Sequence, residues 1–116
     1  MSAETPPTRT AVIALRGPYD LREVALMGFG HRDETSFDGV MRLAFRVDGL
    51  DDHAGVEVRQ RDGELALTVH GDAPLDAVSR QVARVVSADH DGDAWAAVCA
   101  ADPVLERVHA AAPGFR

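Results

Sequence analysis

Cysteine is almost missing from this sequence, which narrows the kinds of site that the chain can build. The 116 residues include one cysteine, Cys99, so an internal disulfide and a cysteine-rich zinc site are excluded. Cys99 lies in the apolar run 94–101, and this setting predicts a buried, unreactive thiol instead of a nucleophile.

Aromatic side chains and positive charge are also scarce. Aromatic residues make up 5% of the chain, so we expect an aliphatic core and few platforms for base stacking. The formal net charge is -7, which opposes a free-standing nucleic-acid binder because a negative surface repels the phosphate backbone. A local group of arginines is still compatible with a contact to that backbone.

Long hydrophobic runs are absent as well. No apolar stretch approaches the roughly 20 residues that cross a bilayer. The first residues lack the basic and apolar regions of a signal peptide. We therefore expect a cytoplasmic protein with no membrane partner and a short disordered leader over residues 1–9.

The chain does contain enough apolar residues, 46%, for the core of one domain. Residues 10–16 are apolar on both faces, which predicts a strand in the middle of a sheet. Residues 40–48 alternate between apolar and polar side chains, as a half-buried strand does. Asp62-Gly63 is a strong hairpin signal between two further alternating segments. The predicted strands are residues 10–16, 34–37, 40–48, 55–61 and 64–70.

Helices are predicted on either side of these strands. Asp20 and Glu23 have the spacing of a capping box, which predicts a helix from there to about residue 29. Asp72 is a candidate cap for a second helix, with Pro74 in its first turn. The apolar residues of this second helix recur at helical spacing, and they are Leu75, Val78, Val82, Val85 and Val86.

This order of elements predicts an α+β fold. Residues 10–88 form an antiparallel sheet of four to five strands, covered by helices on one face, in the order β-α-β(3-4)-α. Residues 89–116 form a helical tail with two short helices.

No group of residues predicts catalysis, a cofactor or a metal. The acidic segment 89–93 departs from the calcium-loop pattern in the places of its glycine and its last ligand, which favours a solvated linker between helices. A metal-dependent enzyme built on Asp89, Asp91 and Asp93 is the weakest alternative. The histidines show no zinc-helix spacing, and Gly28-Phe29-Gly30 follows a helix instead of opening one.

Four arginines are predicted on the outward face of neighbouring strands. They form a modest basic patch with the chemistry for a weak contact to a DNA backbone. Acidic residues share this face, which favours an ordinary ion-paired surface. The four arginines are Arg42, Arg46, Arg59 and Arg61.

The last fifteen residues contain a short amphipathic helix, a Pro-Gly break and an apolar Phe115. Phe115 has nothing downstream to pack against, so we expect the chain to be a fragment whose next segment covers this surface. The candidate domain interface is Val104, Leu105, Val108 and Phe115.

Several of these motifs occur together in one protein family. They are Tyr19-Asp20 before a helix, the alternating strand 41–47, the run 87–92, Asp102-Pro103, and Pro113-Gly114-Phe115-Arg116. In this order the chain, over residues 12–116, resembles the N-terminal domain of bacterial 3-methyladenine DNA glycosylases of the AlkA type, in the actinobacterial branch.

The resemblance implies a small domain similar to one repeat of the TATA-binding-protein fold. In that family the domain precedes a helix-hairpin-helix catalytic domain, which flips a damaged base and hydrolyses its glycosidic bond with an aspartate. The catalytic aspartate and the DNA-gripping hairpin lie beyond the Pro-Gly motif, so no catalytic residue is assigned here. The chain is expected to be inactive alone and to reach damaged duplex DNA only through that domain.

A free-standing interaction module is the alternative prediction. Such a module would self-associate or bind a partner through its C-terminal helices.

Overall fold

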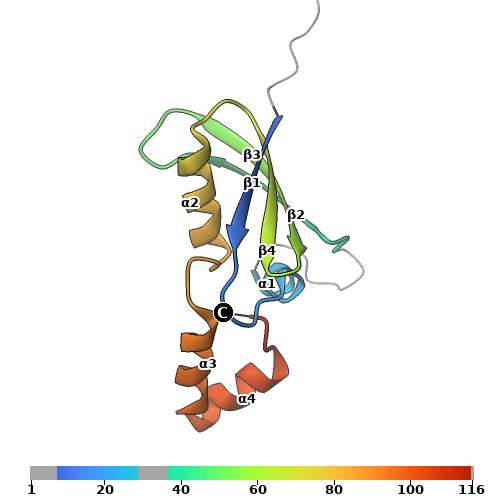
Figure 1. Cartoon of the computed structure of the whole chain (residues 1–116), viewed down its shortest axis with the longest axis vertical. Helices are drawn as coiled ribbons and strands as arrows, with labels where there is room; N and C mark the ends of the chain where they lie inside the picture. Colours follow the sequence, from blue (N-terminus) through green and yellow to red (C-terminus); the bar gives the residue numbers. More distant parts are fainter. Residues whose placement is uncertain (1–7, 29–36, 116) are drawn as a thin grey trace, which may run out of the picture.

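The computed structural model describes residues 8–28 and 37–115, except for the side chains of residues 27 and 28. Within these ranges the chain forms a four-stranded sheet, two helices packed on it and a pair of helices beyond its end (Figure 1). In chain order the elements are β1 (Thr8–Ala14), α1 (Leu21–Gly28), β2 (Val40–Arg46), β3 (His53–Arg61), β4 (Glu64–His70), α2 (Leu75–Val85), α3 (Gly92–Ala100) and α4 (Pro103–Ala111).

The sheet is antiparallel throughout, with the strand order β1-β4-β3-β2. The predicted α+β class and the two short C-terminal helices are confirmed. The prediction that the first strand lies mid-sheet is wrong, because β1 pairs only with β4 and forms an edge. Val12 is 56% exposed on its outer face. Residues 34–36 of the predicted short strand lie outside the described residues, and Phe37 is buried but belongs to no strand.

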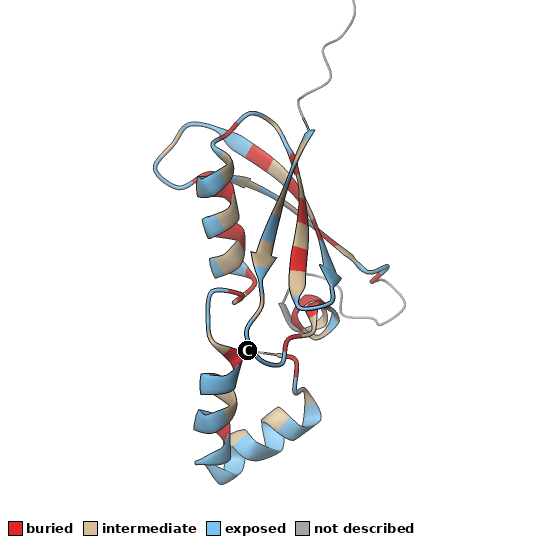
Figure 2. Ribbon diagram, viewed as in Figure 1, coloured by how far each residue is buried: buried red, intermediate tan, exposed pale blue. Residues whose placement is uncertain are grey.

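The core lies between one face of the sheet and the helices α1 and α2. Alternate residues of each strand point to this face, as the period of two requires. Figure 2 shows the resulting bands of buried residues along β3 and β4. The strand residues with the least exposure are Met41, Val56, Val58, Leu65, Leu67 and Val69.

A buried amide side chain joins α2 to the sheet. Gln81 of α2 donates from Nε2 to the carbonyl oxygen of Arg46 at 3.1 Å, and its Oε1 accepts from the N–H of Asp48 at 2.8 Å. The predicted cap of α2 is wrong: Pro74 occupies the N-cap position and no side chain caps the helix. Asp72 lies two residues earlier, outside the first turn.

The pair α3–α4 extends past the end of the sheet but is tied to the β1–α1 connection at two places (Figure 1). At the first tie, the N–H of Gly92 donates to the carbonyl oxygen of Arg16 at 2.7 Å. Gly17 has a φ of +74°, and a Cβ there would collide with the backbone of Gly92 and Asp93.

At the second tie, the C-terminal residues return to the start of α1. The N–H of Asp20 donates to the carbonyl oxygen of Gly114 at 2.8 Å, and the N–H of Gly114 donates to Glu23 Oε2 at 2.9 Å. Asp20 does cap α1, because its Oδ1 accepts from the N–H of Arg22 at 2.9 Å. Glu23 does not complete the predicted capping box, because its carboxylate instead accepts the hydrogen bond from the N–H of Gly114.

Candidate functional site

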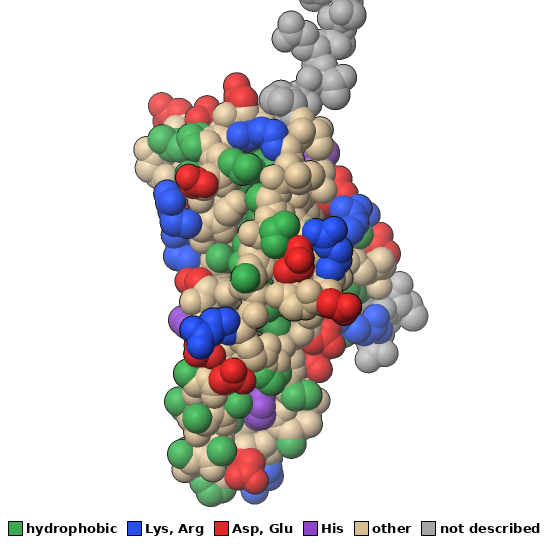
Figure 3. Space-filling model, viewed as in Figure 1, with side chains coloured by type: hydrophobic (Ala, Val, Ile, Leu, Met, Phe, Trp, Pro, Cys, Tyr) green, Lys and Arg blue, Asp and Glu red, His purple; other side chains and the backbone are tan. Residues whose placement is uncertain are grey.

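Exposed apolar side chains gather on α3 and α4. Three of the five large hydrophobic residues recorded as exposed in the described chain lie there: Val98 at 53%, Val104 at 59% and Val108 at 53%. Figure 2 shows most of α3 and α4 as exposed, and Figure 3 shows hydrophobic side chains over this part of the surface. We call this surface the helical flank, defined by Ala94, Ala97, Val98, Ala101, Val104, Val108 and Ala111.

The sequence forms these two helices by local capping. Asp91 Oδ1 accepts from the N–H of Asp93 at 2.9 Å at the start of α3, and Asp102 Oδ1 accepts from the N–H of Val104 at 2.8 Å at the start of α4. Pro103 stands in the first turn, where its missing N–H costs little. Cys99 is 1% exposed, as predicted, so the thiol lies on the inner side of the helix pair.

The four predicted interface residues differ in how far they are exposed. Val104 and Val108 are exposed, one turn apart on α4, and Leu105 is half-buried. Phe115 is half-buried and packs against the core of the sheet domain. The sequence predicts that a following segment covers Phe115, whereas Phe115 packs within this chain because the tie at Gly114 brings it back to the core.

A cavity of about 400 Å³ opens beside α3. It lies at the junction with α2, where Ser87 takes a positive φ of 58° and the chain turns from one helix to the next. Trp95 is half-buried and forms one wall. The sequence contains no signal for this cavity, because it results from how two helices meet. Its lining is Ser87, His90, Asp91, Ala94, Trp95 and Val98.

The four predicted arginines lie at the sheet, and each is ion-paired. The pairs are close, but every guanidinium remains at least 47% exposed, so each pair contributes little to stability. Positive charge on this face is matched by carboxylates rather than gathered into a patch. The pairs are Arg42–Asp38 at 3.0 Å, Arg46–Asp51 at 2.7 Å, Arg59–Glu57 at 2.9 Å and Arg61–Glu64 at 3.0 Å.

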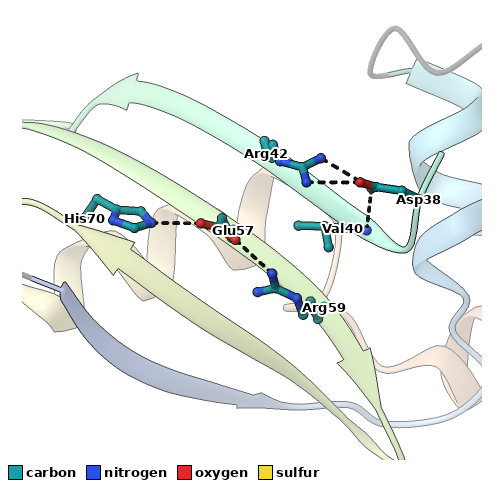
Figure 4. Close-up of polar contacts among 6 residues, drawn as sticks. All are labelled: Asp38, Val40, Arg42, Glu57, Arg59 and His70. Atoms are coloured by element: carbon teal, nitrogen blue, oxygen red, sulfur yellow. Dashed lines mark hydrogen bonds and ion pairs between the residues drawn. The ribbon is translucent and has the colours of Figure 1, made fainter. Parts of the chain in front are cut away.

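These contacts shift the pKa values of two carboxyl groups (Figure 4). His70 Nε2 lies 3.0 Å from Glu57 Oε1, and this hydrogen bond, followed by that from Arg59, lowers the pKa of Glu57 from 4.5. The hydrogen bond from Arg42 is the main cause that lowers the pKa of Asp38 from 3.8. Both carboxylates are therefore held in the charged form that pairs with the arginines.

The acidic segment 89–93 has local structural tasks. Asp91 caps α3 and also lies 3.3 Å from Arg16, and Asp89 lies 3.6 Å from His90. Across residues 8–28 and 37–115, no three His, Cys, Asp or Glu side chains converge as a metal site would need. Within the same ranges, every helix is too short or too polar to span a bilayer.

Comparison with known proteins gives no relative for this chain. No protein-family model, curated protein or solved structure matches it. The sequence resemblance and the geometry of the helical flank are therefore the two observations that bear on function.

Proposed function

We propose that this chain is a non-catalytic docking domain, the N-terminal accessory domain of a 3-methyladenine DNA glycosylase-like repair protein. Its helical flank packs on a helix-hairpin-helix catalytic domain, which carries the base-excision chemistry. The observation that carries the proposal is the exposed apolar surface of α3 and α4, with Val98, Val104 and Val108 more than half exposed. Exposed large apolar side chains gathered on one pair of helices are typical of a surface that another protein or domain covers.

The two ties support a docking role because they fix the direction of the flank. The pair α3–α4 is held by backbone hydrogen bonds at two places: at Gly92, the first residue of α3, and at Gly114, which follows α4. A surface that is rigid before binding loses less conformational entropy when a partner binds. The flank is therefore preorganised for one fixed geometry of the partner.

The electrostatics support contact with DNA through the partner instead of through the sheet. Each of the four outward arginines already has a carboxylate partner, and the whole chain carries a net charge of -7. A phosphate backbone would have to displace these carboxylates and approach a negative surface. The sheet is thus a scaffold that holds the flank.

The direct test uses the isolated helix-hairpin-helix domain of an actinobacterial glycosylase of this type as the partner. We expect a one-to-one complex by calorimetry, and no release of 3-methyladenine from alkylated duplex DNA by the chain alone. The double variant Val104→Asp, Val108→Asp should weaken the complex at least about tenfold, because it places charge in an apolar contact. Val12→Asp is the matched control, since Val12 is as exposed but lies on β1.

Three results would overturn this proposal. They are base release by the chain alone, the absence of a complex, and an equal loss of affinity with Val12→Asp. Self-association through the flank, seen as a concentration-dependent dimer that the double variant abolishes, would favour the free-standing interaction module instead.

A further inference from the structure

Half of the residues that line the cavity beside α3 are apolar side chains of that helix. Ala94 and Val98 lie one helical turn apart along its wall, and both are exposed to solvent. Trp95 supplies a half-buried aromatic surface between them. Two successive turns of α3 thus contribute apolar side chains to the cavity.

Small side chains on α3 suit a helix as the occupant. Ala94 and Ala97 are exposed on α3 beside Val98, and Ala101 is exposed at the C-cap of that helix. Helices pack at interaxial distances of about 8–10 Å, and the shorter distances need small residues at the contact. A partner helix can thus approach α3 closely and place one aliphatic side chain in the cavity.

The charge near the cavity indicates which side chains the rest of the partner helix would carry. One carboxylate, Asp91, lines the cavity, and Asp89 and Asp93 lie two residues before and after it in the sequence. The 3.3 Å contact between Asp91 and Arg16 is with a side chain that is 76% exposed, so solvent screens it strongly. From residue 89 to residue 115 the chain has five carboxylate side chains and a single arginine, Arg107. The segment that contains α3 and α4 therefore carries an excess of negative charge together with exposed apolar side chains.

From this combination we infer that the cavity binds an amphipathic partner helix that inserts an aliphatic side chain and carries basic residues beside it. The inference rests on the proposed docking function and specifies the chemistry of the surface that binds the flank. A second copy of this chain does not fit, because it would bring the same excess of carboxylates and another net charge of -7 to the contact.

The test uses defined helical peptides with Trp95 as the reporter, since Trp95 is the only tryptophan. The first peptide is an amphipathic Leu/Lys helix, the second has the same pattern with Glu in place of Lys, and the third is a scrambled Leu/Lys sequence. We expect the first peptide to shift the Trp95 emission to the blue and to bind at least about tenfold more tightly than the other two. Equal binding by the Leu/Glu peptide, or no response to any peptide, would overturn the inference.

A variant separates apolar insertion from general charge attraction. Val98→Asp adds negative charge, which strengthens any non-specific attraction for Lys, but it also blocks the apolar contact. We expect at least about a tenfold loss of affinity for the Leu/Lys peptide with Val98→Asp and none with Val12→Asp. An unchanged or tighter complex with Val98→Asp would contradict the inference.

The catalytic-domain complex separates this inference from the proposed function. Weakening by both Val98→Asp and the Val104, Val108 double variant supports the two together. A complex that is weakened by the double variant and unaffected by Val98→Asp would refute the cavity and leave the docking function in place. Loss of affinity on adding salt is a further expected result, because the contact between basic residues and carboxylates is electrostatic.

Discussion

At the scale of single residues, two glutamine side chains stabilise this fold at the points where helices meet strand ends. Gln81 satisfies a carbonyl and an N–H just after β2, and Gln60 does the same before α1. Gln60 donates to the carbonyl oxygen of Tyr19 at 2.8 Å and accepts from the N–H of Leu21 at 2.7 Å. Backbone groups of this kind would otherwise be left without a partner in a partly buried place.

Removing one of these amides tests its contribution. We expect Gln81→Ala to lower the free energy of unfolding by about 1–3 kcal/mol, because Arg46 and Asp48 each lose a hydrogen-bond partner. Chemical denaturation measures the change. Arg80→Ala, at the exposed neighbour on α2, should change it by less than about 0.5 kcal/mol. Equal effects of the two substitutions would contradict this assignment.

The carboxyl groups of Asp38 and Glu57 make the stability of the fold depend on pH. Because the pKa values of Asp38 and Glu57 are lowered in the folded chain, their contribution is present above the ordinary values of 3.8 and 4.5. It is lost as the pH falls through the lowered values. We expect Tm to fall between about pH 5 and about pH 3, and less steeply in the double variant Asp38→Asn, Glu57→Gln. An unchanged slope in that variant, matching the control Glu106→Gln, would refute the role of these two groups.

At the scale of elements, local patterns were sufficient to predict most helices and strands. The alternation over 40–48 and the Asp62-Gly63 turn correspond to β2 and to the β3–β4 hairpin. The position of β1 at the sheet edge could not be predicted in the same way, because an apolar strand can have the same sequence pattern at an edge and in the centre of a sheet. Its pairing with β4 joins residues that are between 50 and 62 positions apart.

The candidate site was predicted only in part for the same reason. The apolar spacing of Val104 and Val108 on α4 is local, and both side chains are exposed on the flank. The packing of Phe115 on the core and the cavity at Trp95 depend on contacts between distant segments. Neither a period nor a motif encodes such contacts in a single sequence.

The tie at Gly17 offers a test at this scale. Gly17 and Gly63 have nearly equal φ values, +74° and +71°, but only Gly17 lies against another backbone. We expect Gly63→Ala to cost about 1–2 kcal/mol for the left-handed conformation alone. Gly17→Ala should cost more, since its Cβ collides with Gly92 and Asp93, and should speed amide exchange in α3. Equal costs, with no change in α3, would show that the tie does not hold the helix.

At the scale of the whole molecule, the chain has two contrasting surfaces. The outer face of the sheet carries paired charges, whereas the flank of α3 and α4 is largely apolar and lies on a segment with an excess of carboxylates. Figure 3 shows hydrophobic side chains, with a few charged ones, at the end of the molecule formed by α3 and α4. Paired surface charge is compatible with permanent contact with water, and an exposed apolar surface is best explained by a binding partner.

The most direct test of this account is hydrogen–deuterium exchange of the chain with and without the helix-hairpin-helix domain. The account predicts slower exchange within Gly92–Ala100 and Pro103–Ala111, with β2 and β3 unchanged, because the partner covers only the flank. Protection of the sheet face instead of the flank, or no protection anywhere at saturating partner, would contradict the claim that the flank is the docking surface.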